Sequence, residues 1–193
     1  MEKKILFIID AQNDFMDLGR LGVKGSKKKM DSLAKYIFET KGQYDAYFAS
    51  VDWHPSSHCS FSENGGIWPV HCRQYSEGAA IYQPILDAVD GIHADLHVLK
   101  KGTNEDREEY SVMKNSISNK QIHSFIEANG IDSVDIVGVA GDYCVKDSVD
   151  DFHREFPDIS IRVLLPFVQS IDDGTTLAKF LHSNETIESV EMV

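Results

Sequence analysis

Four short segments of this chain are apolar at consecutive positions, and this pattern most limits the folds that the chain can adopt. They are Lys4–Ile9, Ala46–Val51, Ser133–Val139 and Ile159–Leu165. A strand with one face in water alternates apolar and polar residues, whereas a strand that is covered on both faces stays apolar throughout. The pattern therefore predicts a parallel sheet with helices on both sides.

The segments between these runs have helical patterns. We expect helices over Lys27–Thr40, Ser118–Asn129 and Tyr143–Glu155. For the second helix, Ser118 and Gln121 have the spacing of a capping box, and Gly130 is suited to end it. Two further strands are expected at Leu96–Lys100 and Thr186–Val190. We therefore predict one α/β domain over residues 1–193, a three-layer α/β/α sandwich around a mostly parallel, Rossmann-like sheet of about six strands.

One carboxylate and three imidazoles gather between residues 52 and 71, at Asp52, His54, His58 and His71. Because Asp52 and His54 are two residues apart at the end of a predicted strand, their side chains leave the same face. Oxygen and imidazole ligands suit zinc, iron or manganese. By itself the cluster predicts a metal site at which a metal-bound water could attack a substrate, and chance clustering among eight histidines is the alternative.

Cys144 begins a predicted helix directly after a buried strand. The positive end of a helix lowers the pKa of a thiol and presents free N–H groups to an oxyanion. Asp10 ends the first apolar run, and Lys101 ends the strand that begins at Leu96. If these strand ends meet, Asp10 can take the thiol proton while Lys101 holds the carboxylate and thiolate in their charged forms. We expect a cysteine nucleophile; a buried, inert thiol is the alternative.

Composition narrows the partners and the compartment. The 31 acidic and 19 basic residues give a formal charge of -12, which disfavours nucleic-acid binding and favours a small neutral or cationic ligand. The three cysteines suit neither a disulfide framework nor a four-cysteine zinc site. The run Ile5–Ile9 is too short to cross a membrane or to act in a signal peptide. We expect a cytoplasmic protein with no membrane partner, and the sequence leaves a homo-oligomer open.

Six ordered motifs span nearly the whole chain. They are DAQNDF at 10–15, DWHPSSHCSF at 52–61, WPVHC at 68–72, KG at 101–102, EYS at 109–111 and GVAGDYCV at 138–145. Together they resemble the motifs of nicotinamidases within the isochorismatase-like cysteine hydrolases. Other hydrolases of that superfamily share an Asp, Lys, Cys triad but usually lack the DWH and WPxHC metal motifs. The metal motifs therefore favour the nicotinamidases.

The resemblance implies a catalytic triad of Asp10, Lys101 and Cys144, with Lys101 preferred to Lys100 because the lysine of the family directly precedes a glycine. It implies hydrolysis of nicotinamide to nicotinate and ammonia through a thioester, a step of pyridine nucleotide salvage. One alternative is the same chemistry on another small amide. Another is a metal-binding or redox-responsive protein without turnover, with Cys59 and Cys72 beside the metal as the sensing thiols.

The resemblance also implies one divalent metal ion, held by Asp52, His54 and His71. Zinc is the first expectation, and iron and manganese are the alternatives. In some relatives a further residue of the intervening loop joins the ligands, and here that residue would be His58 or Glu63. With a cysteine as the nucleophile, the open coordination position of the metal is expected to hold the pyridine nitrogen of the substrate.

The remaining implied features shape the pocket. The amides of Ala140 and Cys144 would form the oxyanion hole, after a cis peptide bond between Val139 and Ala140. Phe15 and Trp68 would line the pyridine ring. The chain also departs from the family at two places. Gly141 stands where many relatives have threonine, and the pair at residues 112 and 113, valine and methionine, replaces a small residue followed by an aromatic one.

Overall fold

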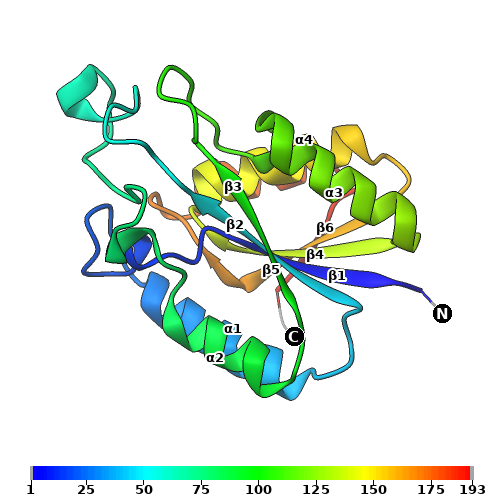
Figure 1. The fold of residues 1–193 in the computed structure, drawn as a ribbon. Coiled ribbons are helices and arrows are strands. Elements are labelled where there is room, and N and C mark those ends of the chain that lie inside the picture. The colour runs from blue at the N-terminus through cyan, green and yellow to red at the C-terminus, as the bar shows by residue number, and fades with distance from the viewer. Residues whose placement is uncertain (1, 192–193) are drawn as a thin grey trace.

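Six parallel strands form one sheet at the centre of the molecule in the computed structural model, which describes residues 2–191 (Figure 1). Their order across the sheet is β3-β2-β1-β4-β5-β6. The strands are β1 Lys4–Ile9, β2 Ala46–Asp52, β3 Leu96–Lys101, β4 Ser133–Val139, β5 Ser160–Gln169 and β6 Glu188–Val190. The predicted class, a three-layer α/β/α sandwich with a parallel six-stranded sheet, is confirmed.

Strand β1 shows why its residues are apolar at every position after Lys4. Consecutive side chains of a strand point to opposite faces of the sheet. Ile5, Phe7 and Ile9 pack into the core on one face, and Leu6 and Ile8 pack into the core on the other. A polar residue at any of these positions would lose its contact with water without gaining a partner.

The predicted strand bounds differ from the observed bounds mainly in the second half of the chain. The bounds of β1 and β4 are as predicted, and β2 and β3 each extend one residue further, to Asp52 and Lys101. Strand β5 begins one residue later than predicted and continues past Pro166 to Gln169, because its register against β4 shifts and pairing resumes at Val168. Strand β6 is shorter than predicted.

In the part of the chain that the structure describes, five α-helices cover the two faces of the sheet. They are α1 Ser26–Glu39, α2 Gln83–Gly91, α3 Ser116–Asn129, α4 Lys146–Glu155 and α5 Thr175–His182. Buried side chains of α1 and α2 belong to one core, and those of α3, α4 and α5 belong to the other. Figure 1 shows α1 and α2 side by side on one face, with α3 and α4 on the opposite face. Within residues 2–191, no helix combines the length and the apolar character needed to span a membrane.

The start of α3 corrects one sequence expectation. The predicted capping box at Ser118 is wrong, because the helix begins two residues earlier, at Ser116. The side chain of Asn115 caps it by accepting hydrogen bonds from the amides of Ile117 and Ser118. The predicted C-terminal cap is confirmed, since Gly130 adopts the left-handed conformation with φ 62°.

Strand order places the functional edge of the sheet. The chain lays down β1, β2 and β3 in one direction and then returns to the other side of β1 with β4. The loops that leave β1 and β4 therefore diverge to opposite faces and open a crevice between their carboxyl ends. In folds of this kind ligands bind at such a switch point.

A cluster of buried charged groups lies near the amino ends of the strands, away from the switch point. Asp135 of β4 is fully buried and accepts two hydrogen bonds from the guanidinium of Arg162, at 2.8 and 2.7 Å. The Lys4 ammonium and the Tyr44 hydroxyl also contact its carboxylate, at 2.8 and 2.7 Å. Burial by itself raises the pKa of Asp135, but these hydrogen bonds outweigh it and hold the pKa below its ordinary value.

Replacing Asp135 with asparagine should lower the free energy of unfolding by about 2 kcal/mol near neutral pH, because two cations lose their shared buried partner. A carboxyl group whose pKa is lowered by folding stabilises the protein above its unfolded-state pKa, and this contribution is lost as the pH falls through the folded-state pKa. The difference between wild type and variant should therefore shrink below about pH 4. Urea unfolding at a series of pH values measures it. The exposed Asp87→Asn is the control, and a pH-independent difference for Asp135→Asn would contradict this account.

Candidate active site

Three predicted residues meet at the switch point of the sheet. Asp10 directly follows β1, Lys101 is the last residue of β3, and Cys144 lies in the turn after β4. Asp10 and Lys101 are fully buried, and Cys144 is nearly so. The Lys101 ammonium lies 2.8 Å from Asp10 Oδ2 and donates a hydrogen bond to Cys144 Sγ at 3.4 Å. The structure therefore brings the predicted triad together.

The backbone of Asp10 adopts a conformation that is unusual for a residue with a side chain. Its φ is 47°, in the left-handed region. The Ser50 hydroxyl donates a hydrogen bond to Asp10 Oδ1 at 2.7 Å and fixes the carboxylate. Strain of this kind persists only where surrounding contacts enforce it, and it is common at functional sites. Burial raises the pKa of Asp10 more than Lys101 lowers it, so this carboxylate is ready to accept a proton.

Lys101 joins this triad to a second carboxylate. Its ammonium donates a hydrogen bond to Asp52 Oδ1 at 2.5 Å. Burial by itself would lower the pKa of Lys101, but Asp10 and Asp52 hold it well above its ordinary value. Lys101 is therefore charged. The neighbouring Lys100 points elsewhere, with its ammonium 4.4 Å from the centre of the Trp53 ring.

Cys144 sits in a π-helical turn, Gly141–Val145, which continues directly into α4. Such turns within helices are frequent at functional sites. The expectation that the helix end lowers the thiol pKa is wrong for this structure. Burial raises the pKa of Cys144 well above its ordinary value, and the carboxylates of Asp10 and Asp52 act in the same direction against Lys101. Cys144 is therefore a thiol at rest and needs a base.

Asp52, His54 and His71 place three metal-binding atoms together. Nε2 of His54 lies 3.4 Å from Asp52 Oδ2, and Nε2 of His71 lies 3.6 Å from the same oxygen. Ligands that bind one zinc ion at about 2.1 Å in tetrahedral geometry lie about 3.4 Å from one another. The three side chains are almost fully buried. Their spacing thus fits a divalent metal.

The other ring nitrogens explain why these two histidines can act as ligands. Nδ1 of His54 lies 3.1 Å from the carbonyl oxygen of Gly102, and Nδ1 of His71 lies 2.8 Å from that of Pro69. Because a carbonyl oxygen only accepts, each Nδ1 carries the proton, and in the neutral ring Nε2 keeps its lone pair. Among the described residues, Nε2 of His54 is buried without a hydrogen-bond partner. One proton could satisfy one of these contacts, whereas a divalent cation would satisfy Asp52 and both rings together.

Gly102 is required for this arrangement. A Cβ atom at this position would lie 2.3 Å from Cε1 of His54, and the backbone φ of 62° also favours glycine. Its amide donates a hydrogen bond to the buried carboxylate of Glu109 at 2.9 Å. The KG and EYS motifs therefore act together to seat His54.

The two candidate additional ligands differ in position. His58 packs against His54 with the two rings tilted, but both of its ring nitrogens have partners, the Ser60 hydroxyl at 2.7 Å and the Arg107 carbonyl oxygen at 3.0 Å. Burial lowers the pKa of His58 to about 4, so its ring is neutral. Glu63 is exposed in a short helical turn. Neither is needed for the three-residue cluster.

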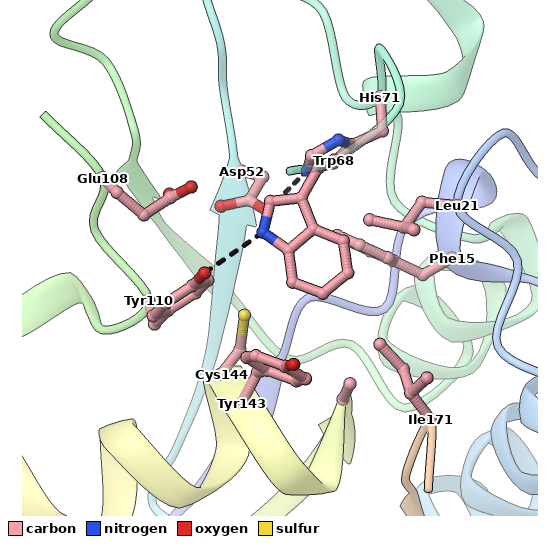
Figure 2. A pocket seen from close by; sticks show the side chains of 11 residues that line it. Phe15, Leu21, Asp52, Trp68, His71, Glu108, Tyr110, Tyr143, Cys144 and Ile171 are labelled. Atoms are coloured by element: carbon pink, nitrogen blue, oxygen red, sulfur yellow. Dashed lines mark hydrogen bonds and ion pairs between the residues drawn. The ribbon is translucent and has the colours of Figure 1, made fainter. Parts of the chain in front are cut away.

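A pocket opens above Cys144, and Figure 2 shows the sulfur pointing into it. Phe15 and Trp68, the predicted ring contacts, both line this pocket. Trp68 Nε1 donates a hydrogen bond to Tyr110 Oη at 3.1 Å and its ring packs edge-on against Tyr143. The full lining is Phe15, Leu21, Asp52, Trp68, His71, Glu108, Tyr110, Ala140, Tyr143, Cys144 and Ile171.

The DAQNDF motif contains two supporting residues whose roles the sequence did not reveal. The Gln12 side-chain amide brackets the backbone of Asp52, accepting from its amide and donating to its carbonyl oxygen, each at 2.8 Å. Asp14 accepts a hydrogen bond from the amide of Cys72 at 2.7 Å and so fixes the segment that carries His71. A signal was present, because both are polar residues in a motif that directly follows a buried strand.

The predicted oxyanion-hole residues, Ala140 and Cys144, both belong to the π-helical turn after β4 or to its cap. Ala140 caps the turn and lines the pocket, and Cys144 lies within the turn. The Val139–Ala140 peptide bond is cis, as expected. Gly141 has a local explanation, because a Cβ atom there would lie 2.2 Å from the Ser170 hydroxyl oxygen.

The other departures and the other two cysteines do not line the pocket, although Cys72 directly follows His71. Val112 and Met113 are buried in the core beneath α3 and do not line the pocket. Burial raises the pKa of Cys72 well above its ordinary value, and burial is also the largest cause that raises the pKa of Cys59. A raised thiol pKa disfavours a redox-sensing role for both.

Known proteins resemble this chain in sequence, although no family model matches it. It is 31% identical over 179 residues to the nicotinamidase/pyrazinamidase of Mycobacterium tuberculosis, with 91% of each chain covered. It is 31% identical over 168 residues to the nicotinamidase of Escherichia coli, with 78% of this chain and 76% of that protein covered.

Solved structures resemble it as well. The pyrazinamidase of Pyrococcus horikoshii in complex with zinc superposes with a TM-score of 0.82 at 28% identity, covering 98% of this chain and 99% of that chain. The yeast nicotinamidase bound to the inhibitor nicotinaldehyde superposes with a TM-score of 0.85 at 26% identity, covering 98% and 100%. From this sequence identity over most of the length of its relatives, the chain belongs to the nicotinamidases of the isochorismatase-like hydrolases.

Proposed function

We propose that this chain hydrolyses nicotinamide to nicotinate and ammonia. The observation that carries the proposal is the Lys101 ammonium, which contacts both Asp10 beside the thiol and Asp52 of the metal cluster. One buried cation thereby links a cysteine nucleophile to a site that can hold the substrate ring. Relatives that are named nicotinamidases support this substrate.

Substrate binding would use the metal cluster and the aromatic walls. Asp52, His54 and His71 would hold a divalent ion, which would be zinc by analogy with the Pyrococcus protein. With three protein ligands, this ion would keep a coordination position open for the pyridine nitrogen. Phe15 and Trp68 would pack against the ring. The carboxamide then faces Cys144, so that binding places the reacting carbon beside the sulfur.

The first half of the reaction forms a thioester. Asp10 takes the proton of Cys144, and the thiolate attacks the carboxamide carbon. The amides of Ala140 and Cys144 donate hydrogen bonds to the oxyanion of the tetrahedral intermediate. Asp10 gives its proton to the leaving nitrogen, and the carbon–nitrogen bond breaks to release ammonia. Lys101 keeps its charge throughout and stabilises the thiolate.

The second half returns the enzyme to its starting state. Asp10 takes a proton from a water molecule, and the resulting hydroxide attacks the thioester carbon. The same two amides stabilise the second oxyanion. The carbon–sulfur bond then breaks, the sulfur regains a proton from Asp10, and nicotinic acid leaves and loses its own proton to solvent to become nicotinate. The net reaction consumes one water and one amide and releases one acid and one ammonia.

We further propose one catalytic domain that acts in pyridine nucleotide salvage in the cytoplasm. All three cysteines are free thiols, which suits a reducing compartment. The chain remains a candidate for a homo-oligomer. The name of the Mycobacterium relative makes pyrazinamide a second substrate to test.

Nicotinamide should be hydrolysed with a kcat/KM at least about 100-fold higher than that of an acyclic amide such as butyramide, because only the aromatic amide offers a ring nitrogen and two ring faces. Steady-state assays of ammonia release measure both values, with pyrazinamide as a third substrate. A preference for the acyclic amide would assign the chain to a different small amide.

Replacing Cys144 with alanine should reduce ammonia release from nicotinamide by about 10⁴-fold or more, because the thioester cannot form. Bound metal and thermal stability should stay close to wild type. The matched control is Cys59→Ala, which alters a cysteine outside the pocket and should retain activity. Full activity of Cys144→Ala would falsify the assignment of the nucleophile.

Replacing His54 with alanine removes one of three metal ligands. Metal affinity should fall by about 100-fold or more, and KM for nicotinamide should rise together with a lower kcat, because the ring nitrogen loses its anchor. Elemental analysis and steady-state kinetics measure these effects. His123→Ala, at a surface histidine bonded to Glu155, is the control. An unchanged KM in a His54→Ala protein shown to lack metal would refute the anchoring role.

A further inference from the structure

Ile171 forms part of an apolar wall of the pocket, and it comes from a loop for which the sequence predicted no role. It lies in the loop between β5 and α5 and is 48% exposed, so about half of its surface remains free to contact a ligand. Figure 2 shows Ile171, Leu21 and Phe15 on one side of the pocket and Asp52 and Cys144 on the other. The wall therefore faces both groups that would fix the substrate.

One carboxylate fixes this wall relative to the nucleophile. Asp142 lies two residues before Cys144, within the same turn, and is almost fully buried. Its Oδ1 accepts a hydrogen bond from the amide of Ile171 at 2.9 Å, and its Oδ2 accepts one from the amide of Asp172 at 3.0 Å. Both oxygens are thus used to attach the Ile171 loop to the turn that carries the sulfur.

Contacts on both sides of Ile171 limit the freedom of this loop further. The Ser170 hydroxyl occupies the space that a side chain at Gly141 would fill. The Asp172 carboxylate accepts hydrogen bonds from the amides of Gly174 and Thr176, at 2.7 and 3.1 Å, and so attaches the loop to the start of α5. The distance from Ile171 to Cys144 is therefore set by short, mostly half-buried contacts.

The chemistry of nicotinamide, the substrate of the proposed function on which this step rests, determines what meets the wall. Its ring nitrogen and the carbon that bears the carboxamide are separated by one ring carbon, C2. If the nitrogen faces the metal cluster and the carboxamide faces Cys144, the edge at C2 points between them. The opposite ring carbon, C5, then points to Ile171 and Leu21.

We propose that Ile171 is a specificity-determining residue that limits the size of substituents at ring position 5, and that Asp142 is its positioning residue. The ligand class is accordingly pyridine-3-carboxamides with hydrogen or a small group at this position. Ile171 supplies bulk and apolar surface, and Asp142 prevents the loop from moving away to admit a larger ring.

Hydrolysis of nicotinamide and 5-ethylnicotinamide by the metal-loaded full chain tests the role of Ile171. The ratio of kcat/KM for the ethyl compound to that for nicotinamide should rise about tenfold in Ile171→Ala, the effect of one to two methylene groups in an apolar pocket. It should fall in Ile171→Phe. The exposed Ile117→Ala in α3 is the matched control. An unchanged ratio in both Ile171 variants, with wild-type activity present, would overturn the proposal.

Asp142→Asn tests the positioning role. Its side-chain NH2 would replace one carboxylate oxygen and would then face a backbone N–H that needs an acceptor. The ratio should shift in the same direction as in Ile171→Ala, with KM for nicotinamide rising more than kcat falls. In the double variant the two effects on the ratio should not add, because both act through one side chain. A variant with reduced thermal stability but an unchanged ratio would show a purely structural role and overturn this part.

Binding separates failure of this inference from failure of the proposed function. Calorimetry with nicotinate and 5-ethylnicotinate should show that Ile171→Ala gains affinity for the ethyl acid relative to nicotinate. That gain in a protein that does not hydrolyse nicotinamide would support the wall and refute the proposed function. Hydrolysis without the gain would refute the wall alone, and no binding of either acid to wild type would refute both.

Discussion

The functional edge of this molecule depends on one buried ammonium. Lys101 is fully buried, and a lysine in that position is tolerated only when carboxylates surround it. Lys101 contacts two carboxylates, Asp10 and Asp52, and the different environments of these two groups shift their pKa values in opposite directions. The pKa of Asp52 lies well below its ordinary value, because Lys101 and His54 together outweigh the effect of burial. The pKa of Asp10 is raised by burial. One carboxylate therefore stays charged and the other can exchange a proton, which is the division that acid–base catalysis needs.

Topology explains how residues far apart in sequence surround this ammonium. Parallel strands all end at the same edge, and the reversal of strand order between β1 and β4 opens a crevice there. The proposed nucleophile Cys144 follows β4, the proposed base Asp10 follows β1, and the proposed metal cluster begins with Asp52 at the end of β2. Short hydrogen bonds then fix the loops that follow the strands: the Gln12 side chain donates one, and the carboxylates of Asp14 and Glu109 accept the others. The sheet provides approximate positions, and these polar contacts provide the final ones.

The sequence predicted the strands better than the helices. Strands buried on both faces carry a mostly apolar run, which is visible without knowledge of their neighbours. Helices α2 and α5 were not anticipated, because each is short and buries only a few residues. The first turn of α3 was misplaced because Asn115 and Ser118 are both suitable caps, and only tertiary contacts choose between them. The predicted direction of the shift in the Cys144 pKa was wrong for a similar reason. The effect of a helix end is local and visible in the sequence, whereas burial among carboxylates depends on the tertiary structure.

The sequence by itself determined the class of fold, the family, and the residues that gather at the carboxyl edge, because apolar runs and motif spacing are properties of the chain alone. Only the tertiary structure decided which nitrogen of each histidine faces Asp52, and which side chains join Phe15 and Trp68 in lining the pocket. These outcomes depend on distances between strands that are far apart in sequence. Ile171 illustrates the difference: nothing in its local sequence marks it, and the Asp142 carboxylate places it opposite Cys144.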